Sequence, residues 1–88
     1  MAKVAIKLKI MPSSPDEDLE KIQNKLKDIL ESKKAVNISF IQEPVAFGLK
    51  AIIATFAWPE EQDTSILENL NIENTSSSQI IDYRRAVG

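Results

Sequence analysis

The sequence predicts an α+β fold in which four antiparallel strands form one sheet and two helices pack on one of its faces. Three observations lead to this prediction. Residues 3–11 alternate between apolar and other side chains, as in a strand with one buried face. Residues 16–32 carry apolar side chains at steps of three and four, as in an amphipathic helix. The order strand–helix–strand then occurs twice, and right-handed crossovers in both halves give the sheet order 4-1-3-2.

Capping signals define the first helix. Pro12 ends the first strand, and the helix is predicted over residues 16–32. Ser14 is the expected N-cap, with Pro15 at the first helical position and Glu17 completing a capping box. Acidic side chains in the first turn stabilise the positive end of the helix dipole. This helix is therefore the best-defined element of the prediction.

The second and third strands flank a short loop. Residues 36–41 alternate in polarity, which predicts a second half-buried strand. Residues 49–58 are almost continuously apolar, as expected of a central strand, and Pro59 halts them. The loop 43–48 between these strands begins with a proline and ends with a glycine.

The second half of the fold carries weaker signals. A second helix is predicted to begin at Asp63 or Thr64, and it should be short because few apolar residues follow. Residues 71–78 are low in helix and strand propensity and are predicted to form a loop. Residues 79–83 then form the last strand.

Composition limits the possible functions. The 88 residues make a single domain with a small core and no room for a deep catalytic cleft. The chain has no cysteine and no histidine, which removes the common nucleophile, general base and metal ligands. Two glycines do not form a phosphate-binding loop. No apolar run is long enough to span a membrane. We therefore expect a cytoplasmic protein that is not an enzyme and has no catalytic residue, cofactor or metal.

Phe47, in the loop 43–48, has two possible interpretations. It can fold back as a lid on the core, which is the commoner role of a loop phenylalanine. Alternatively, the turn-forming loop holds the ring at the rim of the sheet, with Gly48 beside it, and offers it to a partner protein. The residues alone leave both interpretations open.

A pair of arginines, Arg84 and Arg85, follows the last predicted strand in a short tail. Such a pair is commonly a solvated chain end. The planar guanidinium groups are equally suited to an anionic site such as a bound phosphate.

The predicted open sheet face carries Lys7 and Lys9, so binding of single-stranded RNA is an alternative function. RNA recognition on such a face requires aromatic rings that stack on bases, and Tyr83 is the candidate ring. The net charge of −2 argues against it, and no direct contact with nucleic acid is expected. A third alternative is a small-molecule-binding regulatory domain that dimerises edge to edge.

Three stretches together resemble the archaeal elongation factor 1-beta family. They are Met11-Pro12-Ser13-Ser14-Pro15-Asp16-Glu17-Asp18-Leu19-Glu20, Glu43-Pro44-Val45-Ala46-Phe47-Gly48-Leu49-Lys50-Ala51 and Asp82-Tyr83-Arg84-Arg85. The resemblance covers nearly the whole chain. It implies one ferredoxin-like βαββαβ domain, residues 1–88, that acts in translation as a guanine nucleotide exchange factor for the GTPase elongation factor 1-alpha.

The resemblance also implies residue roles. Phe47, with its neighbour Gly48, matches an aromatic that packs against the GTPase. Arg84 or Arg85 is the nearest counterpart of a lysine that enters the magnesium and phosphate region of the GTPase. Lys7, Lys9 and Lys50 are expected to steer the encounter, and the free protein is expected to be a monomer. The segment 70–78 lacks the glycine and valine pattern of the family, which leaves open where the second helix ends.

Overall fold

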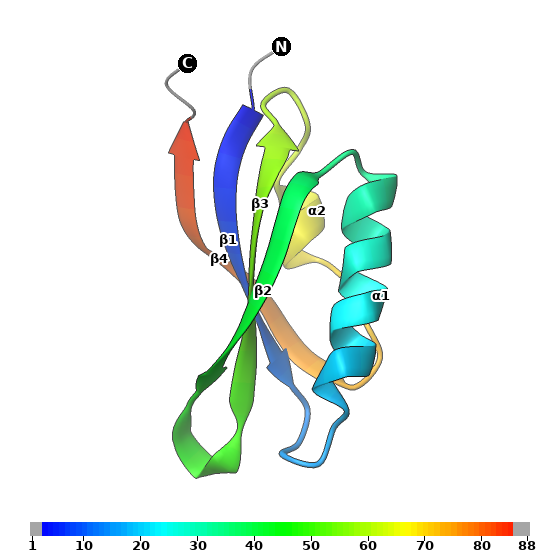
Figure 1. The fold of residues 1–88 in the computed structure, drawn as a ribbon, viewed down its shortest axis with the longest axis vertical. Helices are drawn as coiled ribbons and strands as arrows, with labels where there is room; N and C mark the ends of the chain where they lie inside the picture. Colours follow the sequence, from blue (N-terminus) through cyan, green and yellow to red (C-terminus); the bar gives the residue numbers. More distant parts are fainter. Residues whose placement is uncertain (1–2, 86–88) are drawn as a thin grey trace.

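Four antiparallel strands form one sheet in the order β2-β3-β1-β4, which confirms the predicted order (Figure 1). The structure is a computed structural model, and it describes residues 3–85. The elements in chain order are β1 (Lys3–Pro12), α1 (Leu19–Ser32), β2 (Val36–Pro44), η1 (Ala46–Gly48), β3 (Lys50–Pro59), α2 (Ser65–Glu68) and β4 (Thr75–Arg85).

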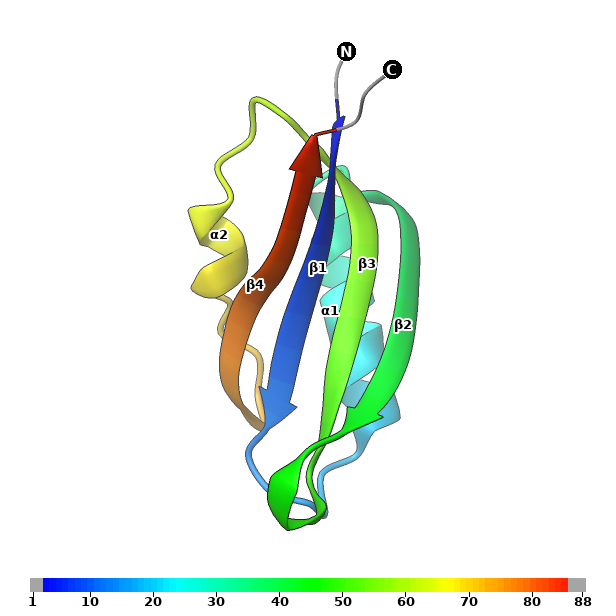
Figure 2. The same cartoon turned by 90° about the vertical axis from the view of Figure 1, so that its left-hand side faces the viewer.

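The two faces of the sheet differ. Both helices lie on one face, with α1 behind the strands in the view of Figure 2 and α2 beside β4. No helix of residues 3–85 covers the other face, which we call the open face. The prediction that both helices share one face is thus confirmed. None of the helices within residues 3–85 is long and apolar enough to cross a membrane.

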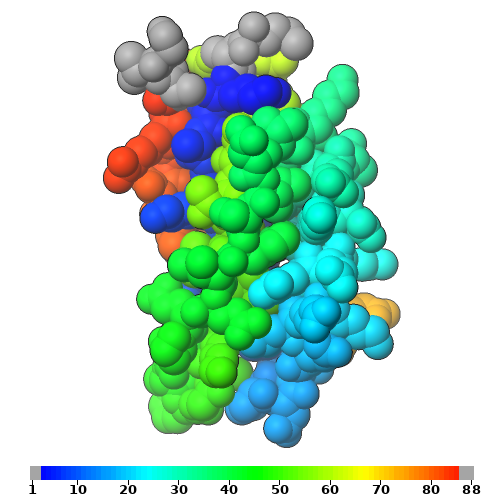
Figure 3. Space-filling model, viewed as in Figure 1, coloured from blue at the N-terminus to red at the C-terminus, as the bar shows by residue number. Residues whose placement is uncertain are grey.

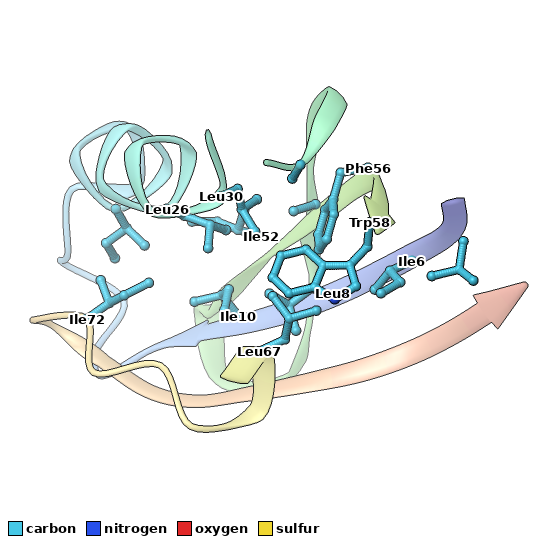
Figure 4. Close-up of a cluster of buried hydrophobic side chains, with 14 residues drawn as sticks. Ile6, Leu8, Ile10, Leu26, Leu30, Ile52, Phe56, Trp58, Leu67 and Ile72 are labelled. Atoms are coloured by element: carbon cyan, nitrogen blue, oxygen red, sulfur yellow. The ribbon is translucent and has the colours of Figure 1, made fainter. Parts of the chain in front are cut away.

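The core lies between the sheet and the two helices, where side chains from β1, β3, α1 and α2 meet (Figure 4). Its largest fully buried members are Trp58, Phe56, Ile6, Leu8, Ile10, Leu26, Leu30, Ile52 and Leu67. The Trp58 indole N–H donates to the carbonyl of Gln62 at 3.2 Å, so its polar group is satisfied inside the apolar cluster. The core therefore holds the sheet against the two helices, and the open face lies on the opposite side of the sheet.

The helix α1 begins three residues later than predicted. Its N-cap is Asp18, whose carboxylate accepts the backbone N–H groups of Glu20 at 3.1 Å and Lys21 at 3.3 Å. The prediction of Ser14 as N-cap is wrong, because Glu17 accepts a hydrogen bond from the Ser13 hydroxyl and does not close a capping box. The acidic segment before α1 is a turn instead of a first helical turn.

The last strand is longer than predicted in both directions. β4 includes Thr75 to Ser78, which were predicted as loop, and Arg84 and Arg85, which were predicted as tail. β1 pairs with β3 along one edge, and β4 pairs with the other edge of β1 from Pro12 to Val4. This pairing outweighs the low strand propensity of the serines. α2 is a single turn, as the few apolar residues predicted.

Candidate functional site

The hairpin between β2 and β3 ends in a tight turn with Phe47 at its tip. β2 continues to Pro44, and the turn is closed by hydrogen bonds from Val45 N to Leu49 O at 2.8 Å and from Leu49 N to Ala46 O at 3.3 Å. The Phe47 side chain is 92% exposed. The interpretation of Phe47 as a lid on the core is therefore wrong.

The backbone of this turn is left-handed. Phe47 has φ 63° and ψ 31°, and Gly48 has φ 75°, as the two central positions of a type I′ turn require. Glycine adopts this conformation freely, whereas an L-residue with a Cβ atom loses about 1–2 kcal/mol in it. The turn thus combines a strained backbone with a fully presented ring, a combination found at functional sites.

The other end of the sheet carries the arginine pair. Because Arg84 lies opposite Ala5 and Arg85 lies opposite Val4, the two arginines point to opposite faces of the sheet. Arg84 is on the open face, where its Nε forms an ion pair with Asp82 at 3.1 Å. Arg85 is on the helix-covered face, where it pairs with Glu60 at 2.8 Å. The strand therefore orients two guanidinium groups that were expected to lie in a tail.

Phe47 and the arginines lie at opposite ends of the molecule. Lys50, at the hairpin end, and Ala57, in the row of Arg84, are seven residues apart on β3, which corresponds to about 23 Å of strand. Figure 3 shows the hairpin, in green, reaching one end of the molecule and β4, in red, near the other. The predicted site residues thus form two groups, with Phe47, Gly48 and Lys50 in one and Arg84 and Arg85 in the other.

No aromatic ring of residues 3–85 lies on the open face. The strand register places Tyr83 opposite the core residue Ile6, so Tyr83 points to the helix-covered side. The interpretation of Tyr83 as a base-stacking ring on the open face is therefore wrong. The remaining rings lie at the hairpin tip or opposite core residues of a neighbouring strand: Phe47, Phe40, Phe56 and Trp58.

The described part of the chain, residues 3–85, holds no group of three His, Cys, Asp or Glu side chains that could bind a metal ion. Asp63, just before α2, has a shifted pKa. The Ser65 backbone N–H donates to this carboxylate at 2.9 Å, and together with the Ser65 side chain it lowers the pKa of Asp63 below the ordinary 3.8. This hydrogen bond closes the turn before α2, whose N-cap is Thr64, and it is not an acid–base device.

The sequence analysis missed two residues of the arginine end. Asp82 and Glu60 each hold one guanidinium group. Asp82 could have been found, because residues two apart in a strand share a face and Asp82 precedes Arg84 by two. Glu60 lies 25 positions before Arg85 in the sequence, and no pattern in the sequence joins them.

Comparison with known proteins yields one family. The EF-1 guanine nucleotide exchange domain matches residues 5–85. Elongation factor 1-beta of Methanocaldococcus jannaschii is 41% identical over 89 residues, covering 98% of this chain and 100% of the relative. That of Methanosarcina barkeri is 40% identical over 88 residues, covering 97% and 99%. That of Metallosphaera sedula is 37% identical over 90 residues, covering 97% of each chain.

Proposed function

The chain belongs to the EF-1 guanine nucleotide exchange domain family of translation elongation factors, and we propose that it accelerates GDP release from elongation factor 1-alpha. Release of GDP lets the GTPase reload with GTP, the form that carries aminoacyl-tRNA. The family has a nucleotide exchange role, which requires binding and no bond chemistry.

Exchange of this kind follows from linkage. A protein that binds the nucleotide-free GTPase more tightly than the GDP-bound form lowers the affinity for GDP by the same factor. The exchange factor therefore needs an anchor that makes the complex and a group that opposes nucleotide or magnesium binding. Neither role requires a histidine, a cysteine or a pocket.

The exposed ring of Phe47 is the observation that carries the proposal. A phenylalanine that is 92% exposed at the tip of a strained turn contributes nothing to the core and gains its stabilisation from a partner. Buried in a pocket of the GTPase, such an anchor contributes about 2 kcal/mol or more to binding. Lys50, exposed at the base of the same hairpin, adds positive charge beside the anchor.

The arginine end supplies the second group. Arg84 and Arg85 are exposed, and each is held only by a surface carboxylate. Surface ion pairs are worth about 0–1 kcal/mol, so a phosphate or a metal-binding carboxylate of the GTPase can replace either partner at little cost. Because this end is about 23 Å from the hairpin, the two groups contact separate regions of the GTPase.

Release of a fluorescent GDP analogue from archaeal elongation factor 1-alpha tests the proposal. The GTPase is loaded with the analogue, excess unlabelled GDP is added, and release is followed with increasing amounts of this protein. The expected result is a dose-dependent acceleration that saturates. If folded protein leaves the release rate unchanged at concentrations well above that of the GTPase, the proposal is wrong.

A further inference from the structure

The open face contains a cleft of about 240 Å³ near the arginine end, lined by Ala5, Ile6, Lys7, Thr55, Asp82 and Arg84. Its floor consists of small side chains from β1 and β3. Its walls are charged, and Lys7 on β1 lies directly opposite Asp82 on β4. Because pockets for small molecules usually measure about 300–1,000 Å³, this cleft is sized for part of a side chain and not for a nucleotide.

The charges of the cleft are not balanced. Two cations, Lys7 and Arg84, and one carboxylate, Asp82, line the cleft. Asp82 pairs with the Nε atom of Arg84, and within residues 3–85 no carboxylate lies within ion-pair distance of Lys7. The ion pair of Arg84 runs through its Nε atom, and the guanidinium carries further N–H donors on its two terminal nitrogens. An incoming carboxylate therefore finds an ammonium group and a guanidinium group that still have donors to offer.

The open face as a whole also carries a net positive charge. The register places four cations there, Lys3, Lys7, Lys9 and Arg84, against two carboxylates, Glu43 and Asp82. The whole chain carries a net charge of −2, so this face is a positive surface on an acidic protein. On the same face lies Ile41, which is 62% exposed and covers its buried cross-strand neighbour Ile53.

We propose that the open face docks on an acidic surface of the partner GTPase, with a carboxylate side chain of the partner entering the cleft between Lys7 and Arg84. The proposal rests on the exchange function proposed above and divides the roles of the two arginines. Arg84 binds the partner protein, and Arg85, on the other face, remains available to the nucleotide region. Asp82 holds Arg84 in place until the partner's carboxylate arrives.

A protein partner fits this face better than RNA does. RNA binding requires aromatic stacking platforms, and no ring of residues 3–85 lies here. The exposed Ile41 suits an apolar contact between proteins.

The test measures GDP release as a function of exchange-factor concentration for matched charge variants. Lys7→Glu reverses a cation of the cleft, whereas Lys27→Glu makes the same change of net charge on α1, behind the sheet. Lys7→Glu should raise the half-saturating concentration by about tenfold, leave the maximal rate within about twofold and weaken the salt dependence. Lys27→Glu should behave as wild type.

Asp82→Asn provides a second test, because its expected result is tighter binding and misfolding would weaken binding. This variant removes the internal carboxylate that competes with the incoming one, so the half-saturating concentration should fall by about threefold. Thermal melts monitored by circular dichroism confirm that each variant is folded.

Each result supports or overturns a defined claim. If the wild type accelerates release but Lys7→Glu matches Lys27→Glu, or Asp82→Asn weakens binding, the cleft proposal is wrong and the exchange function stands. If the wild type has no effect on release, both are wrong. If single-stranded RNA of mixed sequence binds with steep salt dependence and Lys7→Glu abolishes that binding, the face belongs to RNA and the docking proposal is overturned.

Discussion

The two ends of the sheet present their functional groups in opposite ways. At the hairpin end, Phe47 is apolar, has no partner in the described chain and sits on a strained backbone. At the arginine end, Arg84 and Arg85 are charged, lie on a regular strand and are each held by a carboxylate of the same chain. An apolar anchor is positioned by rigid backbone, whereas long charged side chains need partners that stop them from sampling many rotamers.

This difference suggests a division of labour. The free energy of an apolar contact is gained only when water leaves the ring, so Phe47 should govern the stability of the complex. Charged groups act at longer range and distinguish between occupied and empty anionic sites, so the arginine end should govern the rate of release within the complex. Four experiments test or refine the contrast, in order of decreasing expected effect.

Replacing Phe47 by alanine should produce the largest effect. Phe47→Ala should reduce the exchange efficiency by about 30-fold or more, which corresponds to about 2 kcal/mol, because it removes the anchor and no core contact. Stopped-flow release of the GDP analogue measures the exchange efficiency. Tyr83→Ala, at the arginine end, is the matched aromatic control. An unchanged efficiency in Phe47→Ala would remove the anchor role and with it the contrast between the ends.

Replacing Arg85 by alanine should lower the maximal exchange rate by about tenfold, or 1.4 kcal/mol, with a smaller change in the half-saturating concentration. The reason is that a guanidinium acting on the nucleotide region works after the complex has formed. Arg85→Lys keeps the charge and should retain part of the rate. A change confined to the half-saturating concentration would mean that Arg85 only assists docking.

Replacing Phe47 by asparagine should separate stability from function at the hairpin end. Asparagine tolerates positive φ, and Asn-Gly is the preferred pair in a type I′ turn, so Phe47→Asn should raise the free energy of unfolding by about 0.5–1 kcal/mol. Exchange should fall as in Phe47→Ala. Urea denaturation of Phe47→Asn and Phe47→Ala measures the gain in the free energy of unfolding. Equal denaturation midpoints for the two variants would show that the turn stores no strain.

Acidification should slightly weaken the turn between β3 and α2. Asp63 lies on the connection from β3 to α2, and its pKa is lowered by the hydrogen bond from Ser65 N. A carboxyl whose folded-state pKa is depressed stabilises the fold fully above its ordinary value of 3.8, and this contribution is lost as the pH falls through the lower folded-state pKa. Denaturation between pH 5 and pH 2 should show a loss that Asp63→Asn lacks. Identical pH profiles would contradict the stabilising role of this hydrogen bond.

Most of the fold follows from local patterns. The alternation in β1 and the apolar stripe of α1 each predict which face of the element is buried. The order of the elements in the chain, with right-handed crossovers, then predicts the order of the strands in the sheet. The errors arise where tertiary pairing overrides local preference. The serines of β4 become strand because β1 lies beside them, and Asp18 replaces Ser14 as the cap because Ser13 engages Glu17.

The candidate site was less predictable than the fold. The sequence marks Phe47 as a loop residue, yet its left-handed backbone is set by the pairing of β2 and β3 and by Gly48 beside it. Whether Arg84 and Arg85 share a face depends on where β4 ends, which local propensity places too early. The cleft around Lys7 needs three strands in register, and the order of strands alone does not specify it.

The neighbouring positions of β1 and β4 have a practical consequence for tethering. Val4 and Arg85 are cross-strand partners, so a fluorescent label, an affinity tag or a surface linker attached beside either residue lies at the arginine end. A tethered molecule would keep its hairpin pointing away from the support, while a bulky attachment would crowd Arg84 and Arg85. Pull-down with terminally immobilised protein should therefore preserve capture and understate catalysed release, and a probe for turnover studies is better attached to an exposed position on α1.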